Sequence, residues 1–302
     1  MKKIILIALF FILSSAEPIT PIPLTIETDK EKVKLGEKLF FDTILSADNT
    51  ISCASCHDLQ NGGDDGLKFS FGIKGKEGDI NSPTVYNAVY NFRQFWNGSA
   101  KDLAHQTWGP IENPVEMGNK FRKLIMTLQN TPYKQEFEKI YSDGVTKENI
   151  GDAIAEYEKT LITPNAPFDK YLRGDKNAIT QKQKDGYELF KTKGCIACHH
   201  GVNVGGNLYN KFGVMKKVKS KRLGRYEVTG NEVDKYYFKV PSLRNIEKTA
   251  PYLHDGRYDK LEDVVKFMAR YQLGRTISQS DVEKIIRFLI SLNGEIPLSA
   301  NR

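Results

Sequence analysis

The sequences CASCH at residues 53–57 and CIACH at residues 195–199 are two copies of one pattern, C-x-x-C-H. This pattern is the attachment signature of a c-type haem. Because residues three apart lie on one face of a helical turn, both cysteine sulfurs can reach the two vinyl groups of one porphyrin. The histidine that follows then points its imidazole at the haem iron. The sequence therefore predicts two covalently attached haems.

All cysteines of the chain lie in these motifs, Cys53 and Cys56 in the first and Cys195 and Cys198 in the second, so none remains for a disulfide. The alternatives are a zinc site built from two C-x-x-C pairs and a redox dithiol. Zinc ribbons hold their cysteine pairs much closer in sequence, and a redox dithiol does not call for a histidine after both copies. Haem attachment is the favoured interpretation.

The N-terminal residues 1–16 have the pattern of a secretory signal peptide. A short basic start precedes an apolar stretch at residues 4–13 that is too short to span a bilayer, and small residues follow before Glu17. An uncleaved membrane anchor is the alternative. We expect cleavage before Glu17, a periplasmic location in a bacterium, and no membrane span in the mature protein.

The formal net charge of the whole chain is +7. Two of the lysines lie in the predicted signal peptide and haem propionates add negative charge, so composition gives no support for a nucleic-acid partner. One basic run stands out at residues 211–225, which contains Lys216, Lys217, Lys219, Lys221, Arg222 and Arg225. Most such runs are solvated loops. A docking surface for an acidic redox partner is the functional alternative.

A faint internal repeat predicts two similar modules. GEKLF at residues 36–40 precedes the first motif and GYELF at residues 186–190 precedes the second, and apolar spacing of three to four predicts a helix in each. The prolines of TPNAP at residues 163–167 predict a linker. We expect a mainly α fold of two c-type cytochrome domains, residues 17–164 and 165–302, each packed around its attached haem, with long ordered loops.

Other segments have helical periodicity or loop composition. Helices are predicted at residues 120–141, 150–162 and 260–270, and a last helix at a capping box, Ser280-Asp281-Val282-Glu283. Stretches rich in Gly, Asn and Pro predict loops at residues 61–83, 109–119 and 201–210.

Spacing alone does not fix the second axial ligand of either iron. The histidines outside the motifs are His105, His200 and His254. Methionine is the other common ligand, and its thioether raises the haem potential. Core packing is expected for Met126, whereas Met215 and Met268 both follow the second motif and remain alternatives.

Further motifs resemble those of the bacterial dihaem cytochrome c peroxidases. In the second half they are PSLRN at 241–245, TAPYLHDG at 249–256 and MARYQLG at 268–274. In the first half they are NSPTV at 81–85, WNG at 96–98, QTWGP at 106–110 and NPVEM at 113–117. They occur in the family's order and spacing across nearly the whole mature chain. The resemblance implies an enzyme, a homodimer, that reduces H2O2 to water with electrons from a small c-type cytochrome or a cupredoxin.

The resemblance also implies unequal roles for the two haems. His57 would hold the first iron, where peroxide reacts. His199 and Met268 would hold the second iron, which has the higher potential and receives electrons. His254 would lie near the junction of the domains rather than on an iron.

The resemblance assigns three further residues to catalysis and electron transfer. Glu116 matches the acidic residue that moves a proton between the peroxide oxygens, and Gln106 matches its companion in the distal pocket. Trp96 matches the aromatic residue between the haems. Taken alone, each has an ordinary alternative: a surface carboxylate, a polar helix residue and a core aromatic.

One calcium ion at the domain junction is also implied by the resemblance. Asn81 would bind it, together with the backbone carbonyls of Thr249 and Pro251. Calcium prefers such oxygen ligands. Taken alone, Asn81 before Ser-Pro would be a turn residue.

The chain departs from the family at one position of the loop after the first motif. Many of these peroxidases carry a histidine there, which caps the first iron until the second haem is reduced. The corresponding residue here is Ile73, and no histidine occurs between His57 and His105. Isoleucine cannot bind iron, so we expect the first haem to be open when oxidised and to need no reductive activation. Lys74 and Lys76 are the alternative ligands.

The motifs leave three classes of function open. The first is the peroxidase. The second is a dihaem oxidase of a protein or organic substrate, resembling the enzyme that matures methylamine dehydrogenase, which has tyrosine in place of methionine on its second haem. Met268 argues against this class and Tyr271 keeps it open. The third is a dihaem electron carrier, which would not need Glu116, Gln106 or an open iron.

Overall fold

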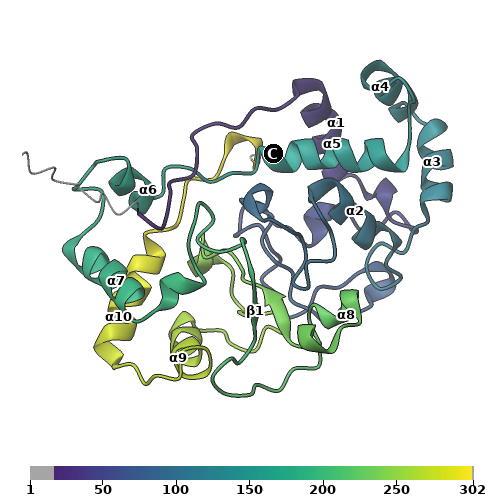
Figure 1. Cartoon of the computed structure of the whole chain (residues 1–302). Helices are drawn as coiled ribbons and strands as arrows, with labels where there is room; N and C mark the ends of the chain where they lie inside the picture. Colours follow the sequence, from purple (N-terminus) through teal and green to yellow (C-terminus); the bar gives the residue numbers. More distant parts are fainter. Residues whose placement is uncertain (1–16, 301–302) are drawn as a thin grey trace, which may run out of the picture.

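The computed structural model describes residues 17–300, so the predicted signal peptide lies outside the described part. The described chain is mainly helical, as the sequence predicts, with one antiparallel pair of short strands (Figure 1). Within residues 17–300, none of the helices has the length and apolar character needed to cross a bilayer. The α-helices are α1 Lys30–Phe41, α2 Leu103–Glu112, α3 Phe121–Gln129, α4 Tyr133–Ile140, α5 Lys147–Lys159, α6 Pro167–Leu172, α7 Gln181–Thr192, α8 Tyr226–Thr229, α9 Leu261–Tyr271 and α10 Gln279–Ile290. The strands are β1 Tyr209–Lys211 and β2 Tyr237–Lys239.

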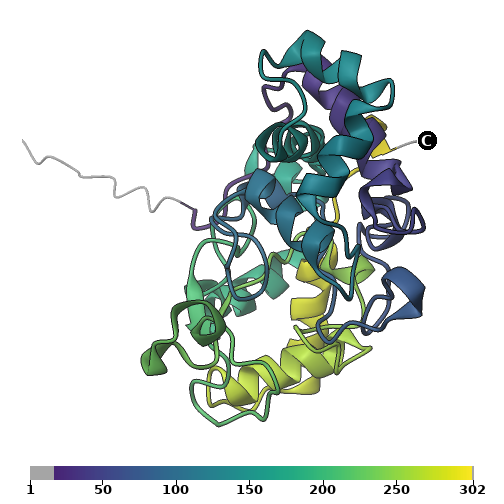
Figure 2. The same cartoon turned by 90° about the vertical axis from the view of Figure 1, so that its right-hand side faces the viewer.

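The helices form two groups, one from each half of the sequence. In Figure 1, α1 to α5 gather at one end and α7, α9 and α10 at the other, and in Figure 2 α9 and α10 again lie opposite α1 and α5. One hydrophobic cluster draws on residues 35–161 and a second on residues 168–292. Ile19 packs in the second cluster and Ala300 in the first, so both ends of the chain cross over. The boundary at 164/165 stays a prediction.

The internal repeat is explained by one helix pair built twice. α1 packs on α5, and α7 packs on α10. A Cβ at Gly36 would lie 1.8 Å from the carbonyl oxygen of Ala153, and a Cβ at Gly186 would lie 2.0 Å from that of Lys284. Glycine at the first position of each repeat therefore lets two helix backbones touch. Phe40 and Phe190, at the last position, are both buried.

Several local predictions differ from the structure. The loops expected at residues 109–119 and 201–210 are shorter, because α2 extends to Glu112 and β1 begins at Tyr209. The helix expected at residues 120–141 is split into α3 and α4 around Pro132, which has no N–H to continue the first helix. The last helix is capped by Ser278, whose side chain accepts from the N–H of Asp281, and not by Ser280. The prediction that Met126 packs in the core is wrong, because its side chain is 58% exposed.

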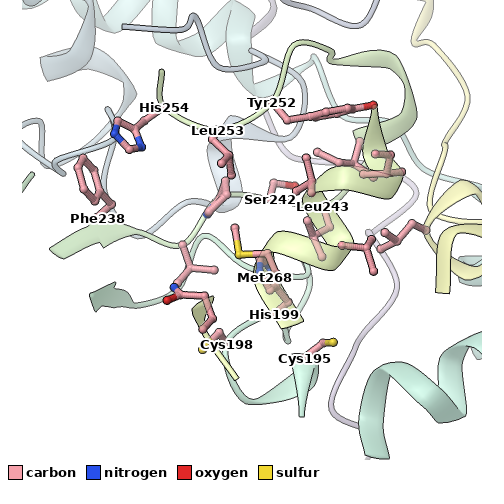
Figure 3. Close-up of a pocket in the computed structure, with 18 of the residues that line it drawn as sticks. Cys195, Cys198, His199, Phe238, Ser242, Leu243, Tyr252, Leu253, His254 and Met268 are labelled. Atoms are coloured by element: carbon pink, nitrogen blue, oxygen red, sulfur yellow. The ribbon is translucent and has the colours of Figure 1, made fainter. Parts of the chain in front are cut away.

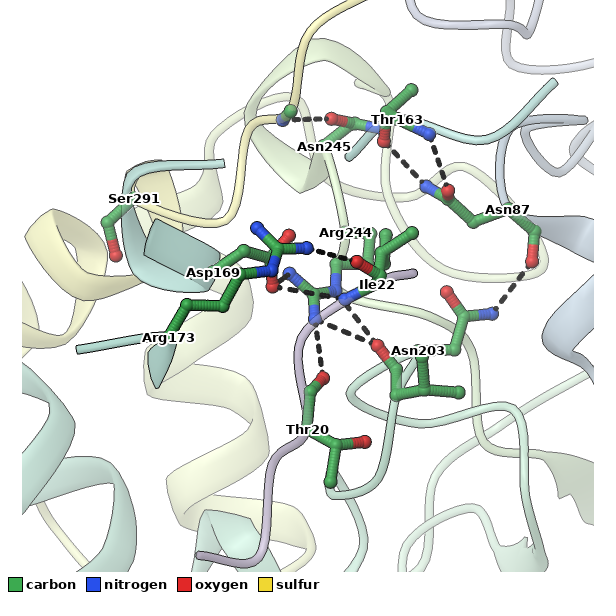
Figure 4. A network of polar contacts seen from close by, with 12 residues as sticks. Thr20, Ile22, Asn87, Thr163, Asp169, Arg173, Asn203, Arg244, Asn245 and Ser291 are labelled. Carbon is green, nitrogen blue, oxygen red and sulfur yellow. Dashed lines mark hydrogen bonds and ion pairs between the residues drawn. The ribbon is translucent and has the colours of Figure 1, made fainter. Parts of the chain in front are cut away.

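A buried polar network joins the segment 163–167 to both halves of the chain (Figure 4). Thr163 is 2% exposed. Its N–H donates to Asn87 Oδ1 at 2.8 Å, and its hydroxyl accepts from Asn87 Nδ2 at 2.8 Å and from Asn245 Nδ2 at 2.9 Å. Asn203 Nδ2 donates to the carbonyl of Asn87 at 3.3 Å. The segment between α5 and α6 is thus a fixed joint and not a flexible tether.

Beside this network lies a fully buried ion pair. Arg244 Nη1 lies 2.7 Å from Asp169 Oδ1, and both side chains are 0% exposed. Arg244 also donates to the carbonyls of Val202 and Thr20. A buried charge pair is tolerated only when such extra hydrogen bonds complete it. The pair fastens the N-terminal segment and α6 to the second half of the chain.

Replacing Gly36 by alanine tests the close approach of α1 to α5. Helix propensity alone predicts that Gly36→Ala stabilises the protein by about 0.5–1 kcal/mol. Overlap with the Ala153 carbonyl predicts the reverse, a loss of about 1–3 kcal/mol. We expect the loss, measured as a lower urea midpoint. Lys34→Ala, on the exposed face of the same helix, should change stability by less than about 0.5 kcal/mol. A Gly36→Ala protein as stable as wild type would contradict the packing.

Candidate functional site

The residues of the second C-x-x-C-H motif line a cavity between the two halves of the chain (Figure 3). Residues Cys195–Ala197 form one 3-10 turn directly after α7. Cys195, Cys198 and His199 line the cavity, and Met268 of α9 lines it as well. Asn210 Nδ2 donates to the sulfur of Cys198 at 3.0 Å. Two sulfurs for attachment, an imidazole and a thioether therefore share one mainly apolar cavity, as a haem requires.

The ring of His199 is held in the tautomer that can bind iron. Its Nδ1 lies 3.4 Å from the carbonyl of Val204, which can only accept, so Nδ1 carries the proton and Nε2 keeps its lone pair. Burial lowers the pKa of this imidazole to about 4. A Cβ on Gly205 would lie 3.3 Å from Nδ1 and 2.2 Å from the Pro241 carbonyl, so only glycine fits behind the ring.

The structure separates the two methionines that spacing left as alternatives. Met268 lines the cavity of His199, whereas Met215 is 59% exposed. Tyr271, one turn beyond Met268, is stacked on Phe267 with ring centroids 4.6 Å apart and is not among the described residues that line the cavity. Met268 is therefore better placed than Met215 to face His199.

The first motif repeats this arrangement. Residues Cys53–Ser55 form a 3-10 turn, and the Nδ1 of His57 lies 3.1 Å from the carbonyl of Gly63. This again leaves Nε2 free. Burial lowers the pKa of His57, which keeps the ring neutral near pH 7. Both motifs thus present the donor set of a covalently attached haem.

Glu116 follows α2 and is half-buried. Burial raises the pKa of its carboxyl group, and a hydrogen bond from Asn113 opposes the rise. Asn113 Nδ2 donates to Oε1 at 2.6 Å. The pKa of the Cys56 thiol is raised to about 11, mainly by burial, with smaller contributions from the charges of Asp65 and Glu116. Glu116 is therefore close enough to the first motif to act on it electrostatically. Asn113, which orients the carboxylate, was not predicted as a site residue, although it stands in the NPVEM motif.

The loop that contains Ile73 is packed directly against Glu116. The N–H of Ile73 donates to the carbonyl of Glu116 at 2.8 Å. A Cβ on Gly72 would lie 2.0 Å from the carbonyl of Val115, and a Cβ on Gly118 would lie 2.3 Å from Ile73 Cδ1. Ile73 itself is 7% exposed. These contacts thus hold the loop against the segment that contains Glu116, the candidate catalytic residue.

The two lysines of this loop point elsewhere. Lys74 is exposed and has a positive φ of 58°. The Lys76 ammonium donates to the carbonyl of Pro114 at 2.8 Å.

Trp96 connects the two halves of the chain. Its indole N–H donates to the carbonyl of Asn81 at 2.9 Å, and the residue lines the cavity of the second motif. Gln106 is half-buried on α2, and within residues 17–300 it shares no hydrogen bond with Glu116. His254 is buried, stacks on Phe238 at 4.3 Å and bonds Ser220 through Nε2 at 2.9 Å.

The predicted calcium residues converge on the same cavity. Asn81, Thr249 and Pro251 all line it. Asn81 is 5% exposed, and its Nδ2 donates to the carbonyl of Leu67 at 2.9 Å, which leaves Oδ1 for another partner. Asp64, 2% exposed, lines the cavity too, and its Oδ1 has no hydrogen-bond partner in the described chain.

Sequence reasoning missed three buried charged residues near the motifs. Burial raises the pKa of Asp64 to about 7 and that of Glu158 to about 8, and it lowers the pKa of Lys239 to about 8. Glu158 acts electrostatically on Cys53. Nothing in the sequence near these positions distinguishes them from surface charges, because their burial comes from segments far away along the chain.

Comparison with known proteins gives a consistent result. The family model for di-haem cytochrome c peroxidases matches residues 30–177. The cytochrome c peroxidase of Escherichia coli is 50% identical over 285 residues, which is 92% of this chain and 61% of that relative, so the chain spans less than two thirds of its length. The cytochrome c551 peroxidase of Nitrosomonas europaea is 47% identical over 290 residues, 95% of this chain and 87% of the relative.

More distant similarities extend the same picture. The methylamine utilization protein MauG of Methylophilus methylotrophus is 30% identical over 291 residues, covering 91% of this chain and 86% of that protein. Among solved structures, a MauG-like protein associated with microbial copper homeostasis superposes with a TM-score of 0.78 at 22% identity, covering 94% of this chain and 95% of that one. At that identity the structural match supports the fold alone.

Exchange of the two methionines by glutamine tests which one faces His199. We expect Met268→Gln to lower the midpoint potential of the second haem, because a hard oxygen or nitrogen ligand replaces the thioether. Met215→Gln, on the exposed loop, should leave the potential and the visible spectrum unchanged. Redox titration followed by absorbance measures both. The assignment fails if Met215→Gln shifts the potential and Met268→Gln does not.

Proposed function

The chain belongs to the di-haem cytochrome c peroxidase family, and from this premise we propose that it reduces H2O2 to water with electrons from a small redox protein. The observation that carries the proposal is the unequal surroundings of the two motifs. A half-buried carboxylate, Glu116, lies near enough to Cys56 of the first motif to act on it electrostatically, and Met268, which carries a thioether, lines the cavity of the second motif. An electron carrier would not need the carboxylate.

We propose that Cys53, Cys56 and His57 hold the first haem. Cys195 and Cys198 would attach the second haem, and His199 and Met268 would hold its iron. The first haem would supply an iron that binds peroxide, and the second would supply electrons. The division of labour follows from the ligands, because a thioether favours the reduced iron.

Glu116 moves the proton in this proposal. Reduction of H2O2 to two waters needs two electrons and two protons. The Glu116 carboxylate takes a proton from one peroxide oxygen and returns it to the oxygen that leaves as water, a transfer that a positioned carboxylate accelerates by about 10²–10⁴-fold. Asn113 fixes Oε1, so Oε2 is the atom left to exchange the proton. Gln106 orients the peroxide without competing for it.

The first haem is open before any reduction in our proposal. Three observations support it: Ile73 has no ligating atom, its N–H donates to the Glu116 carbonyl, and its side chain is buried against Gly118. The alternative ligands Lys74 and Lys76 lie exposed or bonded to Pro114. Because the loop of Ile73 carries no residue that must first leave the iron, the Glu116 carboxylate is in position before any reduction.

We further propose that a small c-type cytochrome or a cupredoxin delivers electrons at the second haem. The basic run has a suitable location, because the N–H groups of Met215 and Lys216 donate to the carbonyl of Tyr271 at the end of α9, the helix of Met268. Val214 and Met215 are 50% and 59% exposed there, beside exposed lysines. An exposed apolar patch next to lysine side chains is suited to binding an acidic partner protein. Trp96 carries electrons onward between the haems.

The remaining features of the proposal follow from the sequence and the cavity. The signal-peptide pattern of residues 1–16 supports a periplasmic enzyme, and the resemblance supports a homodimer. One calcium ion binds Asn81 Oδ1 and the carbonyls of Thr249 and Pro251, all of which line one cavity. The neighbouring carboxylate of Asp64 suits a cation there.

Removing the charge of Glu116 tests the proposed reaction. We expect Glu116→Gln to reduce kcat/KM for H2O2 by at least about 10²-fold, since the amide cannot accept the peroxide proton. In wild type the carboxylate is the active form, so kcat/KM should fall as the pH drops through the raised pKa of Glu116. The variant should lack this acid limb. Steady-state turnover with a reduced cytochrome c measures both effects.

Glu112→Gln is the matched control for this experiment. Glu112 lies one turn earlier, is half-buried and pairs with Lys147 at 3.4 Å. Its loss should leave the turnover within about twofold, because a surface ion pair contributes little. Unchanged turnover in Glu116→Gln would remove Glu116 from its role.

Placing a histidine at Ile73 tests whether the first haem is open. We expect the oxidised wild type to show a high-spin EPR signal and to react with peroxide at once. Ile73→His should convert that signal to low spin and introduce a lag that prior reduction removes. Ile73→Val, which adds no ligand, should behave as wild type at a cost of about 0.5–1.5 kcal/mol in stability. Two low-spin haems in the oxidised wild type would overturn the idea.

A further inference from the structure

Lys239 is a buried cation without an anion in the described chain. The residue is 6% exposed, and within residues 17–300 no charge and no side-chain hydrogen bond acts on its ammonium. Burial lowers its pKa to about 8, and no neighbouring charge opposes that shift. An unpaired buried charge costs several kcal/mol. Elsewhere the chain avoids this cost, since the buried Arg244 is paired with Asp169.

The backbone fixes Lys239 at the cavity of the second motif. It ends β2, opposite Tyr209 of β1, and its N–H donates to the carbonyl of Trp96 at 2.8 Å. Lys239 lines the cavity together with His199 and Met268. Lys239 is thus held by the same backbone that holds Trp96, the proposed link between the haems.

No other charged residue that lines the cavity neutralises Lys239. Lys193 and Arg275 are themselves cations; Lys193 is paired with Asp281 at 2.9 Å, and Arg275 is exposed. Asp64 is the one carboxylate among the described lining residues. Burial and the neighbouring Asp65 raise its pKa to about 7, and Lys239 is not among the charges that act on it. The part of the cavity around Lys239 therefore calls for an anion from outside the polypeptide.

We propose that the Lys239 ammonium is the counter-ion of a propionate of the second haem and that it raises the potential of that haem. The two haem propionates are the anionic groups of the ligand whose attachment cysteines and axial residues line this cavity. A cation close to the haem favours the reduced iron, which carries one positive charge fewer. Lys239 is thus a positioning residue for electron entry. The inference rests on haem attachment at Cys195 and Cys198 and is independent of peroxide reduction.

Charge removal and charge retention at this position distinguish the role of the ammonium from that of the side-chain volume. In purified full-length protein, Lys239→Met should shift the reduction equilibrium of the second haem at least tenfold toward the oxidised form, about 59 mV for one electron. Lys239→Arg should stay within threefold of wild type. Lys193→Met is the control, a lysine of the same cavity that is already paired, and it should also stay within threefold. Redox titration followed by absorbance gives all the values.

The remaining outcomes for the Lys239 variants either contradict the proposal or support it. A Lys239→Met potential within threefold of wild type at full haem content overturns it. So does an equal shift in Lys239→Arg and Lys239→Met, because volume and not charge would then matter. If Lys239→Met lacks the second haem while Lys239→Arg keeps it, the charge positions the haem as proposed; loss in both variants overturns the proposal. A crystal structure with Nζ more than about 4 Å from both propionates would also reject it.

Discussion

The hydroxyl and N–H of Thr163 are the joint on which the rest of the structure depends. The N–H donates to Asn87 of the first half, and the hydroxyl accepts from Asn87 and from Asn245 of the second half. All three residues are buried. Since buried amides must keep their hydrogen bonds, the two halves cannot slide without breaking several at once. Electron transfer between two haems depends on a fixed separation. A rigid polar joint provides it where a flexible linker would not.

The same structural unit occurs in both halves of the chain, on either side of this joint. In both halves a glycine-led helix packs on a partner helix, a turn carries the cysteines, and a backbone carbonyl fixes the histidine tautomer. The difference lies in the residues near each motif. Glu116, held by Asn113, acts electrostatically on Cys56 of the first motif, and Met268 on α9 lines the cavity of the second. In the proposed reaction, the difference between the two sites would arise from a few residues on a repeated scaffold.

Sequence could predict what is encoded locally. The C-x-x-C-H motifs and the helices before them depend on residues a few positions apart. The role of the repeat glycines needed the fold, because Gly36 meets Ala153 and Gly186 meets Lys284. The cap at Ser278 was missed by two residues because Ser280 offers a similar pattern, and only the backbone conformation distinguishes them. The burial of Asp64, Glu158 and Lys239 depends on segments far along the chain, so no local pattern announces it. The fit of Ile73 under Glu116 likewise needed the fold.

The distribution of buried charge connects folding with cofactor attachment. Arg244 and Asp169 neutralise each other and tie the N-terminal segment in place, so this pair needs nothing from outside. Lys239 and Asp64 instead line the cavity of the second motif, and in the described chain no charge acts on Lys239 and no hydrogen bond reaches Oδ1 of Asp64. A polypeptide that buries such charges is stabilised by whatever neutralises them, because a ligand that binds only the folded state shifts the folding equilibrium. Haem propionates and a cation are the groups whose charges complement Lys239 and Asp64. Under the proposal for Lys239, attachment of the haem would complete the electrostatics of the fold as well as the redox site.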